Sequence, residues 1–435
     1  MRRRLLALLP LVAFTGCGSP PPTTPTSAAV TPVITTPTED VKPTTPAQHP
    51  LDPKPTQKAE PKPDPKPEPK EDPKPEPKAD PKAMREAEQY LTKFGGVLYR
   101  DESPQSKQRG VVISVQFFGG DVSKVELKRL AVFPKLASLN LSNTQNTDAV
   151  LKQLADLPNI TTLTLEDAAC TDEGMKAVAA MPNLTKLVLP RAKLTPAGFQ
   201  ALAGCKALQI LDADETAIDD ASVKALGAVK TLTTLSLKGT KLTLKGTGSA
   251  FMGWEKLTEV DLRECALDDE SLVPLGVAKS LQVLKIGGAN VSVTDDGVKV
   301  LDRLTKLKSF TLEGAERVTG SGFAKLDALR ELEVIYLGGS GISDAGMTSL
   351  ARLTGVKTLS LEKTKITDAG VKELATSRAL EKLSVEETAV TDTGLLTLVE
   401  KAKKLAQVDV RKSKITQKGA AEAMKKRPEL VVSFE

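Results

Sequence analysis

Few side chains in this chain are suited to catalysis, and their positions exclude the common catalytic sites. The sole histidine, His49, lies in a proline-rich stretch near the N-terminus. The rest of the chain therefore has no imidazole for a Ser-His or Cys-His pair or for a zinc site. No glycine-rich phosphate loop ending in Lys-Ser or Lys-Thr is present in the sequence. We expect no enzyme activity, no metal and no cofactor.

A cluster of acidic residues is the best remaining candidate for chemistry. It suits calcium or a cationic partner, but Lys238, Arg263 and Lys285 are interleaved with it. We therefore favour a neutralised, solvated surface. Hydrolysis would need carboxyl groups with raised pKa values in an apolar cleft, and an open sheet offers no such cleft. The cluster comprises Asp212, Asp214, Glu215, Glu259, Asp261 and Glu264.

An internal repeat carries these residues. The apolar triplet Val356, Leu359 and Leu361 has the spacing L-x-x-L-x-L, and equivalents of Leu361 recur every 24 to 26 residues. About 13 such units cover residues 111–435, and Val432 with Phe434 predicts a closing edge strand. A fixed period of this length is typical of a solenoid, in which each unit buries its apolar face against its neighbours.

Two periodicities alternate within one unit. Leu359 and Leu361 lie two residues apart with Ser360 pointing the other way, which predicts a short strand with Ser360 exposed. Thr367 and Asp368 then predict a helix N-cap, and the helical spacing of the apolar residues that follow continues this helix. Each unit is thus expected to be strand, turn, helix and return.

The consensus L-x-x-L-x-L-x-x-T-x-I-T-D-x-G-V-x-x-L resembles the leucine-rich repeats, and its helical second half resembles the ribonuclease-inhibitor-like subtype. The resemblance implies an α/β solenoid shaped as a horseshoe, with a parallel sheet on the concave side and helices on the convex side. Where many such repeats have Asn, this chain has hydroxyl residues, one cysteine and alanines. We expect the hydroxyls to bond loop amides, and the alanine turns to depend on backbone or water. The hydroxyl positions are Thr144, Thr216, Thr240, Ser340, Thr364, Thr388 and Ser413.

Three cysteines and the sole tryptophan occupy repeat positions. Cys170 aligns with an apolar isoleucine site, Cys205 and Trp254 with an apolar leucine site, and Cys265 with the turn hydroxyl. We predict buried, reduced thiols and a core tryptophan. A disulfide is the alternative, since an exported protein meets an oxidising environment.

The N-terminus has the layout of an export signal. Residues 1–16 combine a basic start with an apolar run of about ten residues, too short for a permanent membrane span. The end of this run, Phe14 to Cys17, resembles the lipobox of bacterial lipoproteins, in which the residue matching Cys17 is acylated and anchors the protein. Gly18 resembles the residue of lipoproteins sent to an outer membrane. A plain signal peptide with a chance cysteine is the alternative.

Residues 17–80 are rich in Pro, Thr, Lys and Glu, which predicts a disordered spacer with polyproline II character. Attachment to a wall polymer or to a proline-reading partner is an alternative role for it. Asp80 and Pro81 then predict the start of a helix, and residues 81–110 are expected to be an N-terminal cap. The whole chain is therefore one elongated repeat domain with an N-terminal tail.

The outward strand positions are where the units stop resembling one another, so a partner is expected there. In the middle outward row, Tyr336 is the single aromatic residue. Buried aromatic side chains often anchor interfaces, although a tolerated surface tyrosine is an equal alternative. The candidate partner-binding residues are Tyr336, Val334, Val283, Asp212, Asp261 and Glu259.

Composition narrows the class of partner. The net charge is +5 and aromatic residues make up 3% of the chain, with no basic stripe interleaved with aromatics, so we expect no nucleic acid. The sequence favours a non-catalytic, lipid-anchored scaffold of the bacterial envelope that binds a protein or another macromolecule on its concave face. A structural envelope spacer is the alternative.

Overall fold

A computed structural model describes residues 80–434 apart from positions 108, 146, 155 and 156. These residues belong to one compact unit. The predicted signal peptide, Cys17, His49 and all but the last residue of the predicted spacer lie outside the described residues. No helix within the described part is long and apolar enough to cross a membrane.

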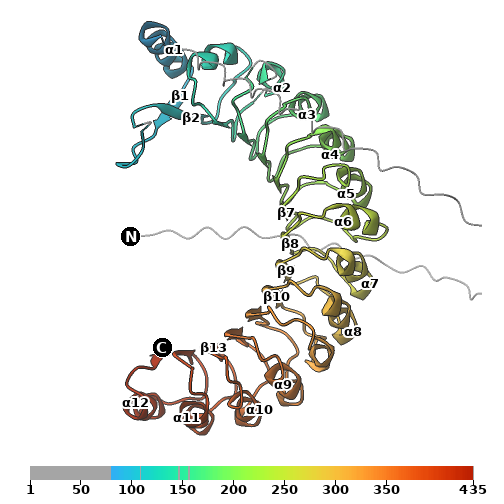
Figure 1. Cartoon of the computed structure of the whole chain (residues 1–435), viewed down its shortest axis with the longest axis vertical. Helices are drawn as coiled ribbons and strands as arrows, with labels where there is room; N and C mark the ends of the chain where they lie inside the picture. The colour runs from blue at the N-terminus through green and yellow to red at the C-terminus, as the bar shows by residue number, and fades with distance from the viewer. Residues whose placement is uncertain (1–79, 108, 146, 155–156, 435) are drawn as a thin grey trace, which may run out of the picture. The chain divides into compact units, whose positions relative to one another are not determined.

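One 15-stranded sheet runs through the described unit, and every strand pairs with its neighbours in chain order. β1 is antiparallel to β2, and all later pairs are parallel. The strands line the concave side and the helices the convex side (Figure 1), which confirms the predicted solenoid. The strands are β1 Gly96–Arg100, β2 Val112–Phe117, β3 Ser138–Asn140, β4 Thr162–Thr164, β5 Lys186–Val188, β6 Ile210–Asp212, β7 Thr234–Ser236, β8 Glu259–Arg263, β9 Val283–Gly287, β10 Ser309–Glu313, β11 Val334–Tyr336, β12 Thr358–Ser360, β13 Lys382–Ser384, β14 Gln407–Asp409 and β15 Val431–Ser433.

The convex elements are less uniform than the sequence predicted. After β2 and after β10 the described unit has 3-10 turns, η1 Leu127–Val132 and η6 Ser321–Lys325, in place of an α-helix. Gly320, with φ of 107°, precedes η6 where other units place a capping residue, so the chain enters this turn from a left-handed conformation. The other convex elements are α2 Asp148–Leu151, α3 Asp172–Ala179, α4 Pro196–Ala201, η3 Leu202–Gly204, α5 Asp220–Leu226, α6 Gly248–Gly253, α7 Asp269–Leu272, η4 Val273–Val277, α8 Asp295–Lys299, η5 Val300–Arg303, α9 Asp344–Ala351, α10 Asp368–Leu374, α11 Asp392–Lys401 and α12 Gln417–Lys426.

The predicted strand phase is confirmed by the core. Leu235 and Leu359 are 0% and 2% exposed and point into the layer between sheet and helices. The predicted exposure of Ser360 is wrong: the residue faces the concave side as predicted but is only 9% exposed. Its neighbours on the concave face cover it, so the outward side of the sheet is not uniformly open to solvent.

A repeated carboxylate bridge links successive helix starts. In the bridge between α9 and α10, the Asp344 carboxylate accepts from Thr367 N at 2.7 Å and from Thr367 Oγ1 at 2.6 Å. Thr367 in turn caps α10, as predicted, by accepting from Ala369 N at 3.2 Å. Eight Asp–Thr pairs of this kind are present: 148–171, 172–195, 220–243, 269–294, 295–319, 344–367, 368–391 and 392–416.

The bridge explains the glycine in the T-D-x-G motif. A β-carbon on Gly370 would lie 2.5 Å from Asp344 Oδ1, and the Gly370 amide donates to that same oxygen at 3.0 Å. Glycine therefore makes room for the carboxylate of the preceding unit. The motif is an inter-unit contact as well as a local helix cap.

The bridge is missing at four steps of the described array. At the first, from η1 to α2, Lys124 stands in place of the aspartate and Thr147 makes no side-chain capping bond. Pro196 replaces the aspartate before α5, and Leu244 replaces it before α7. Gly320 replaces it before α9, where Ser343 makes no side-chain capping bond. At this last step the backbones of the two successive units are in close contact, because a β-carbon on Gly320 would lie 2.6 Å from Gly346 Cα.

The turn after most strands differs from the predicted one. Thr144, Thr364 and Thr388 do not bond loop amides; their hydroxyls donate to the carbonyl of the apolar residue just after the strand, at 2.6, 2.6 and 2.7 Å. Ser413 makes the predicted bond, because its Oγ accepts from Ile415 N at 3.2 Å. The residue before each hydroxyl has positive φ, for example 55° at Lys363 and 66° at Gly339. The turn is thus held by a left-handed residue and a hydroxyl-to-carbonyl bond.

Both ends of the described array are covered. α1 Pro81–Lys93 begins with Asp80 as its N-cap and proline at the first position, as predicted, and packs with η1. β1 adds an antiparallel strand to β2, which the sequence did not predict. At the other end Arg427 is buried and donates to the carbonyls of Ala402 and Leu405 at 2.8 and 3.0 Å.

The predicted core positions of the cysteines and the tryptophan are confirmed. Cys170, Cys205 and Cys265 are buried free thiols, and burial raises the pKa of Cys170 and of Cys205 to about 12. Trp254 is fully buried, and its Nε1 donates to the Leu226 carbonyl at 3.1 Å.

Candidate functional site

The concave face of the sheet presents a continuous row of outward side chains, here called the central row. Each member pairs in register with the member on the next strand. The periodicity of the sequence predicts this row, and the structure brings its members together across the sheet. The row is Gln116, Asn140, Thr164, Val188, Asp212, Ser236, Asp261, Lys285, Thr311, Tyr336, Ser360, Ser384 and Asp409.

Tyr336 is an exposed aromatic side chain in the middle of the C-terminal half of this face. It is 37% exposed, and Val334 lies two residues earlier on the same strand. Val283 is in register with Ser309, which is in register with Val334, so the two valines share a neighbouring row two strands apart. Both valines are half-buried. Tyr336 therefore offers the larger accessible apolar surface.

The acidic candidates on β8 are already paired with basic residues of β8 and β9. Asp261 is 7% exposed, and its carboxylate is held by Arg263, with Nη2 to Oδ2 at 2.6 Å and Nε to Oδ1 at 3.0 Å. Glu259 pairs with Lys285 Nζ at 2.5 Å. These ion pairs agree with the neutralised surface that we favoured. Asp261 in particular has little carboxylate surface left for a partner.

Asp212 and Asp214 form a separate group on β6 and the turn after it. Asp214 accepts from Ser236 Oγ at 2.6 Å and from Lys238 N at 2.9 Å, and its own amide donates to Asp212 at 3.2 Å. Burial, followed by the charge of Asp214, raises the pKa of Asp212. Five strand spacings separate β6 from β11, about 24 Å along the sheet. Asp212 and Tyr336 therefore belong to different parts of the concave face.

Acidic residues missed by the sequence analysis line the end of β10 and the same position on β12 and β13. Glu313, Glu362 and Glu386 each follow the last apolar residue of a strand. Their recurrence at this one step, in the stretches TLEG, SLEK and SVEE, is the signal that could have identified them. They give the C-terminal half of the concave face an acidic margin beside Tyr336.

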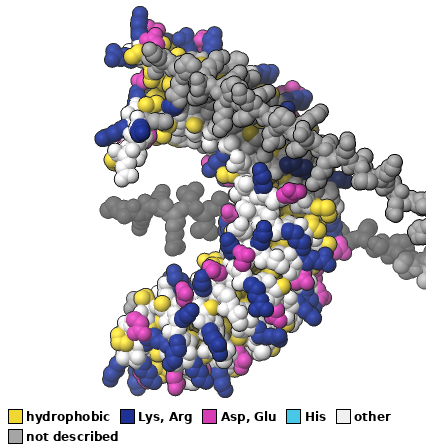
Figure 2. Space-filling view, viewed as in Figure 1, with side chains coloured by type: hydrophobic (Ala, Val, Ile, Leu, Met, Phe, Trp, Pro, Cys, Tyr) yellow, Lys and Arg dark blue, Asp and Glu magenta, His cyan; other side chains and the backbone are white. Residues whose placement is uncertain are grey.

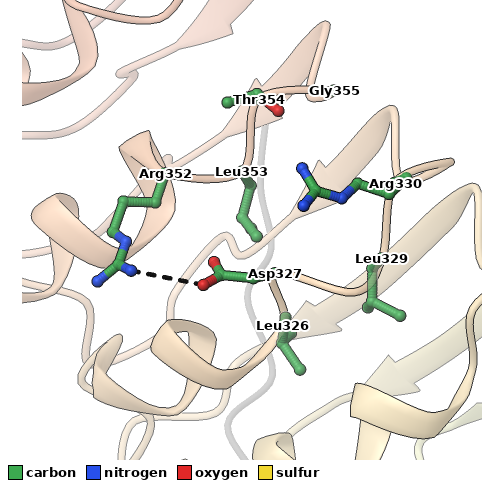
Figure 3. Close-up of a pocket in the computed structure, with 8 residues that line it drawn as sticks. All are labelled: Leu326, Asp327, Leu329, Arg330, Arg352, Leu353, Thr354 and Gly355. Atoms are coloured by element: carbon green, nitrogen blue, oxygen red, sulfur yellow. Dashed lines mark hydrogen bonds and ion pairs between the residues drawn. The ribbon is translucent and has the colours of Figure 1, made fainter.

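Two hollows lie away from Tyr336. One, of 580 Å³, lies where β8, β9 and β10 extend two residues further than most strands; Gly287 and Gly288 leave it open between Arg263 and Glu313. The other, of 330 Å³, lies beyond the C-terminal end of η6 (Figure 3), where Arg352 pairs with Asp327 at 3.4 Å. Leu326, Leu329 and Leu353 form its apolar lining. Neither hollow brings together a nucleophile and a base.

The described residues contain no group of three or more His, Cys, Asp or Glu side chains that could hold a metal ion. Positive and negative side chains are interspersed over the visible surface of the described unit (Figure 2), without a continuous basic stripe in this view. The geometry is that of a broad polar surface on which Tyr336 is the one aromatic side chain of the central row; Tyr99 on β1 and Phe118 after β2 are also exposed, at the N-terminal end of the sheet.

Comparison with known proteins identifies the repeat. The family model described as "Leucine Rich repeat" matches residues 255–276 and 354–375. The chain is a leucine-rich-repeat protein. Among solved structures, this leucine-rich-repeat protein is similar to an internalin (inlF) from Listeria monocytogenes, with 17% identity and a TM-score of 0.57, over 80% of this chain and 93% of that chain.

A leucine-rich-repeat protein from Leptospira interrogans is also similar, with 16% identity and a TM-score of 0.41, over 70% of this chain and 92% of that chain. No curated protein matches the sequence. At 17% identity the likeness to the internalin concerns the fold alone, and the function of this leucine-rich-repeat protein has to be argued from its own concave face.

Proposed function

We propose that this leucine-rich-repeat protein is a non-catalytic scaffold that binds a protein partner on the concave face of its sheet. The observation that carries the proposal is the central row, in which outward side chains change in chemistry from strand to strand while the inward side chains stay apolar and buried. Such a surface can be fitted to a partner without disturbing the core. The row consists mainly of small polar side chains, which suit adaptable contacts around one aromatic anchor.

We further propose that the protein is exported and held at the bacterial envelope, at an outer membrane or the cell surface, through a lipid on Cys17. The sequence from Phe14 to Gly18 supports this proposal. Wild-type protein should partition into the detergent phase with its membrane, whereas Cys17→Ser should stay unprocessed or become soluble. Mass spectrometry of a mature wild-type protein without lipid would refute the anchor.

Site-specific photocrosslinking tests the concave face. A photoreactive amino acid placed at Thr164, Tyr336 or Ser384 should give a defined adduct in cells, and the same amino acid at Lys372 on exposed α10 surface should not. Adducts from Lys372 alone would reject the proposal. Absence of adducts from every position would favour the structural spacer instead.

Affinity measurements with the captured partner refine the test. Tyr336→Ala should weaken binding by about 1–2 kcal/mol, because it removes the exposed aromatic contact. Asp212→Lys should act mainly on the association rate. Lys372→Ala is the matched convex control and should leave both quantities unchanged.

A further inference from the structure

A third hollow, of 350 Å³, lies beside Tyr336 on the concave face between β10 and β14. Its lining includes the carboxylates of Glu313, Glu362 and Asp409 and the ammonium group of Lys382. Carboxylates thus outnumber cations in the lining. Asp409 is already held by Arg411, with Nη2 to Oδ2 at 2.6 Å, and this contact lowers the pKa of Asp409.

Two hydroxyl groups in the hollow lack a hydrogen-bond partner among the described residues. Ser360 is 9% exposed and lines the hollow, yet its hydroxyl makes none of the side-chain hydrogen bonds found in this unit. Ser384, on the next strand, has a buried Oγ that is likewise unsatisfied. Ser236 in the same row differs, because its hydroxyl donates to Asp214. The buried Ser384 hydroxyl without a partner costs free energy, which a ligand with hydrogen-bond donors would recover, and the Ser360 hydroxyl offers a second acceptor beside it.

Glu313 and Glu362 make no direct ion pair within the described unit, in contrast to Asp261 on the same face; Arg263 and Arg411 act on them only from a longer distance. Both are half-buried. Gly338 lies on the intervening strand segment, and a β-carbon there would meet Glu362 Cγ at 2.7 Å and Oε1 at 2.9 Å. The Glu362 side chain thus leans over Gly338, toward β10. Burial and then the charge of Glu362 raise the pKa of Glu313, so the two carboxylates oppose each other electrostatically.

We propose that this hollow receives an arginine side chain of the protein partner, between the ring of Tyr336, the carboxylates of Glu313 and Glu362, and the hydroxyls of Ser360 and Ser384. A guanidinium carries five N–H donors and no acceptor, which matches a lining of free acceptors. It stacks on aromatic rings and pairs with carboxylates better than an ammonium does. The inference rests on the proposed function and names the chemistry of the partner at one position.

Fluorine NMR can test the site directly, because the chain has three tyrosines. In full-length protein labelled with 3-fluorotyrosine, the three lines are assigned with Tyr90→Phe, Tyr99→Phe and Tyr336→Phe. The probe is the peptide acetyl-Gly-Arg-Gly-amide. It should shift the Tyr336 line saturably and leave the other two lines in place. The citrulline peptide, a neutral match in shape, should shift none.

Variants of the two carboxylates complete the design. Glu313→Gln and Glu362→Gln should each weaken the arginine peptide at least several-fold, and Glu373→Gln on the exposed surface of α10 should not. Because burial and the charge of Glu362 both disfavour the ionised form of Glu313, Glu313→Gln should not lower the melting temperature. A loss of binding with an intact fold is therefore measurable.

The result that overturns the inference is a Tyr336 line that does not respond, or one that responds equally to citrulline. An equally tight lysine peptide would also reject the assignment to a guanidinium. These outcomes are separable from the proposed function, because concave crosslinks to the partner would persist if only the arginine site were wrong.

Discussion

The carboxylate of Asp172 fills the space that a β-carbon on Gly198 would need, with Oδ1 only 2.4 Å from that position. Oδ1 also accepts from Thr195 N at 3.0 Å, so the carboxylate joins the start of α4 to α3. The repeat therefore needs glycine at this position, because the aspartate of the preceding unit occupies the space of a side chain.

Gly198→Ala should therefore destabilise the wild-type protein by about 1–3 kcal/mol, the usual cost of overpacking. In an Asp172→Ala background the same change should be neutral, or stabilising by up to about 1 kcal/mol, because alanine favours the helix. Urea unfolding of the four proteins of this cycle measures the reversal. Equal effects in both backgrounds would show that the carboxylate is not the cause.

The core of the strands gives a second prediction. Leu359→Ala should cost about 2–5 kcal/mol by leaving a cavity between sheet and helices. Thr358→Ala, on the outward side of the same strand, should cost less than about 1 kcal/mol. Ser360→Ala should stay within about 0.5 kcal/mol, because the Ser360 hydroxyl makes no hydrogen bond to another described residue. Thermal unfolding with matched denaturant curves distinguishes the three; a large loss for Ser360→Ala would mean that its hydroxyl is bonded.

Asp295 gives a prediction about pH. Its burial tends to raise its pKa, but hydrogen bonds from Thr319, Gly320 and Gly322 outweigh burial and lower the pKa below 3.8. A carboxyl group whose pKa is lower in the folded state stabilises the fold above its unfolded pKa and loses this contribution as the pH falls.

The difference in unfolding free energy between wild type and Asp295→Ala should thus be constant near neutral pH and shrink below about pH 4. Denaturant curves at several pH values measure this difference. Asp296→Ala is the neighbouring control, since Asp296 is exposed and pairs only with Lys299 among the described residues. A difference that grows on acidification would contradict the assignment.

The left-handed turn residue gives a fourth prediction. Lys363 has φ of 55°, a conformation that costs an L-residue with a side chain about 1–2 kcal/mol. Lys363→Gly should therefore be neutral, or stabilising by up to about 1 kcal/mol. Lys365→Gly, two residues later in a backbone of ordinary φ, should destabilise by about 0.5–1 kcal/mol. The opposite order in chemical denaturation would refute the role of the turn.

The sequence predicted the alternation of strands and helices in the described array because the repeat period is visible in the spacing of apolar residues. Leu359 and Leu361 determine which face of the strand is buried, and Thr367 starts the helix. The contacts between units were harder to predict. Asp368 was assigned only to its own helix start, and its bond to Thr391 of the following unit depends on how closely successive helices stack.

The candidate site was predicted only in part. The register of Tyr336 with Ser360 follows from counting residues, since each strand contributes one member to the central row. The ion pair between Asp261 and Arg263 and the burial of Ser360 depend on side-chain conformations, which cannot be read from the repeat spacing. Glu313 and Glu362 escaped notice because they lie one step beyond the alternating strand pattern, where the sheet ends and the turn begins.

The steps without an Asp–Thr bridge have a mechanical consequence. A repeat array pulled from its two ends carries the same tension through every junction, so it yields first where the fewest side-chain bonds cross. The junctions after Pro196, Leu244 and Gly320 divide the bridged units into four blocks. Under load the array should unfold in steps of several units rather than one unit at a time. The block from Asp344 to Thr416 should unfold last, because three consecutive bridges link its helices.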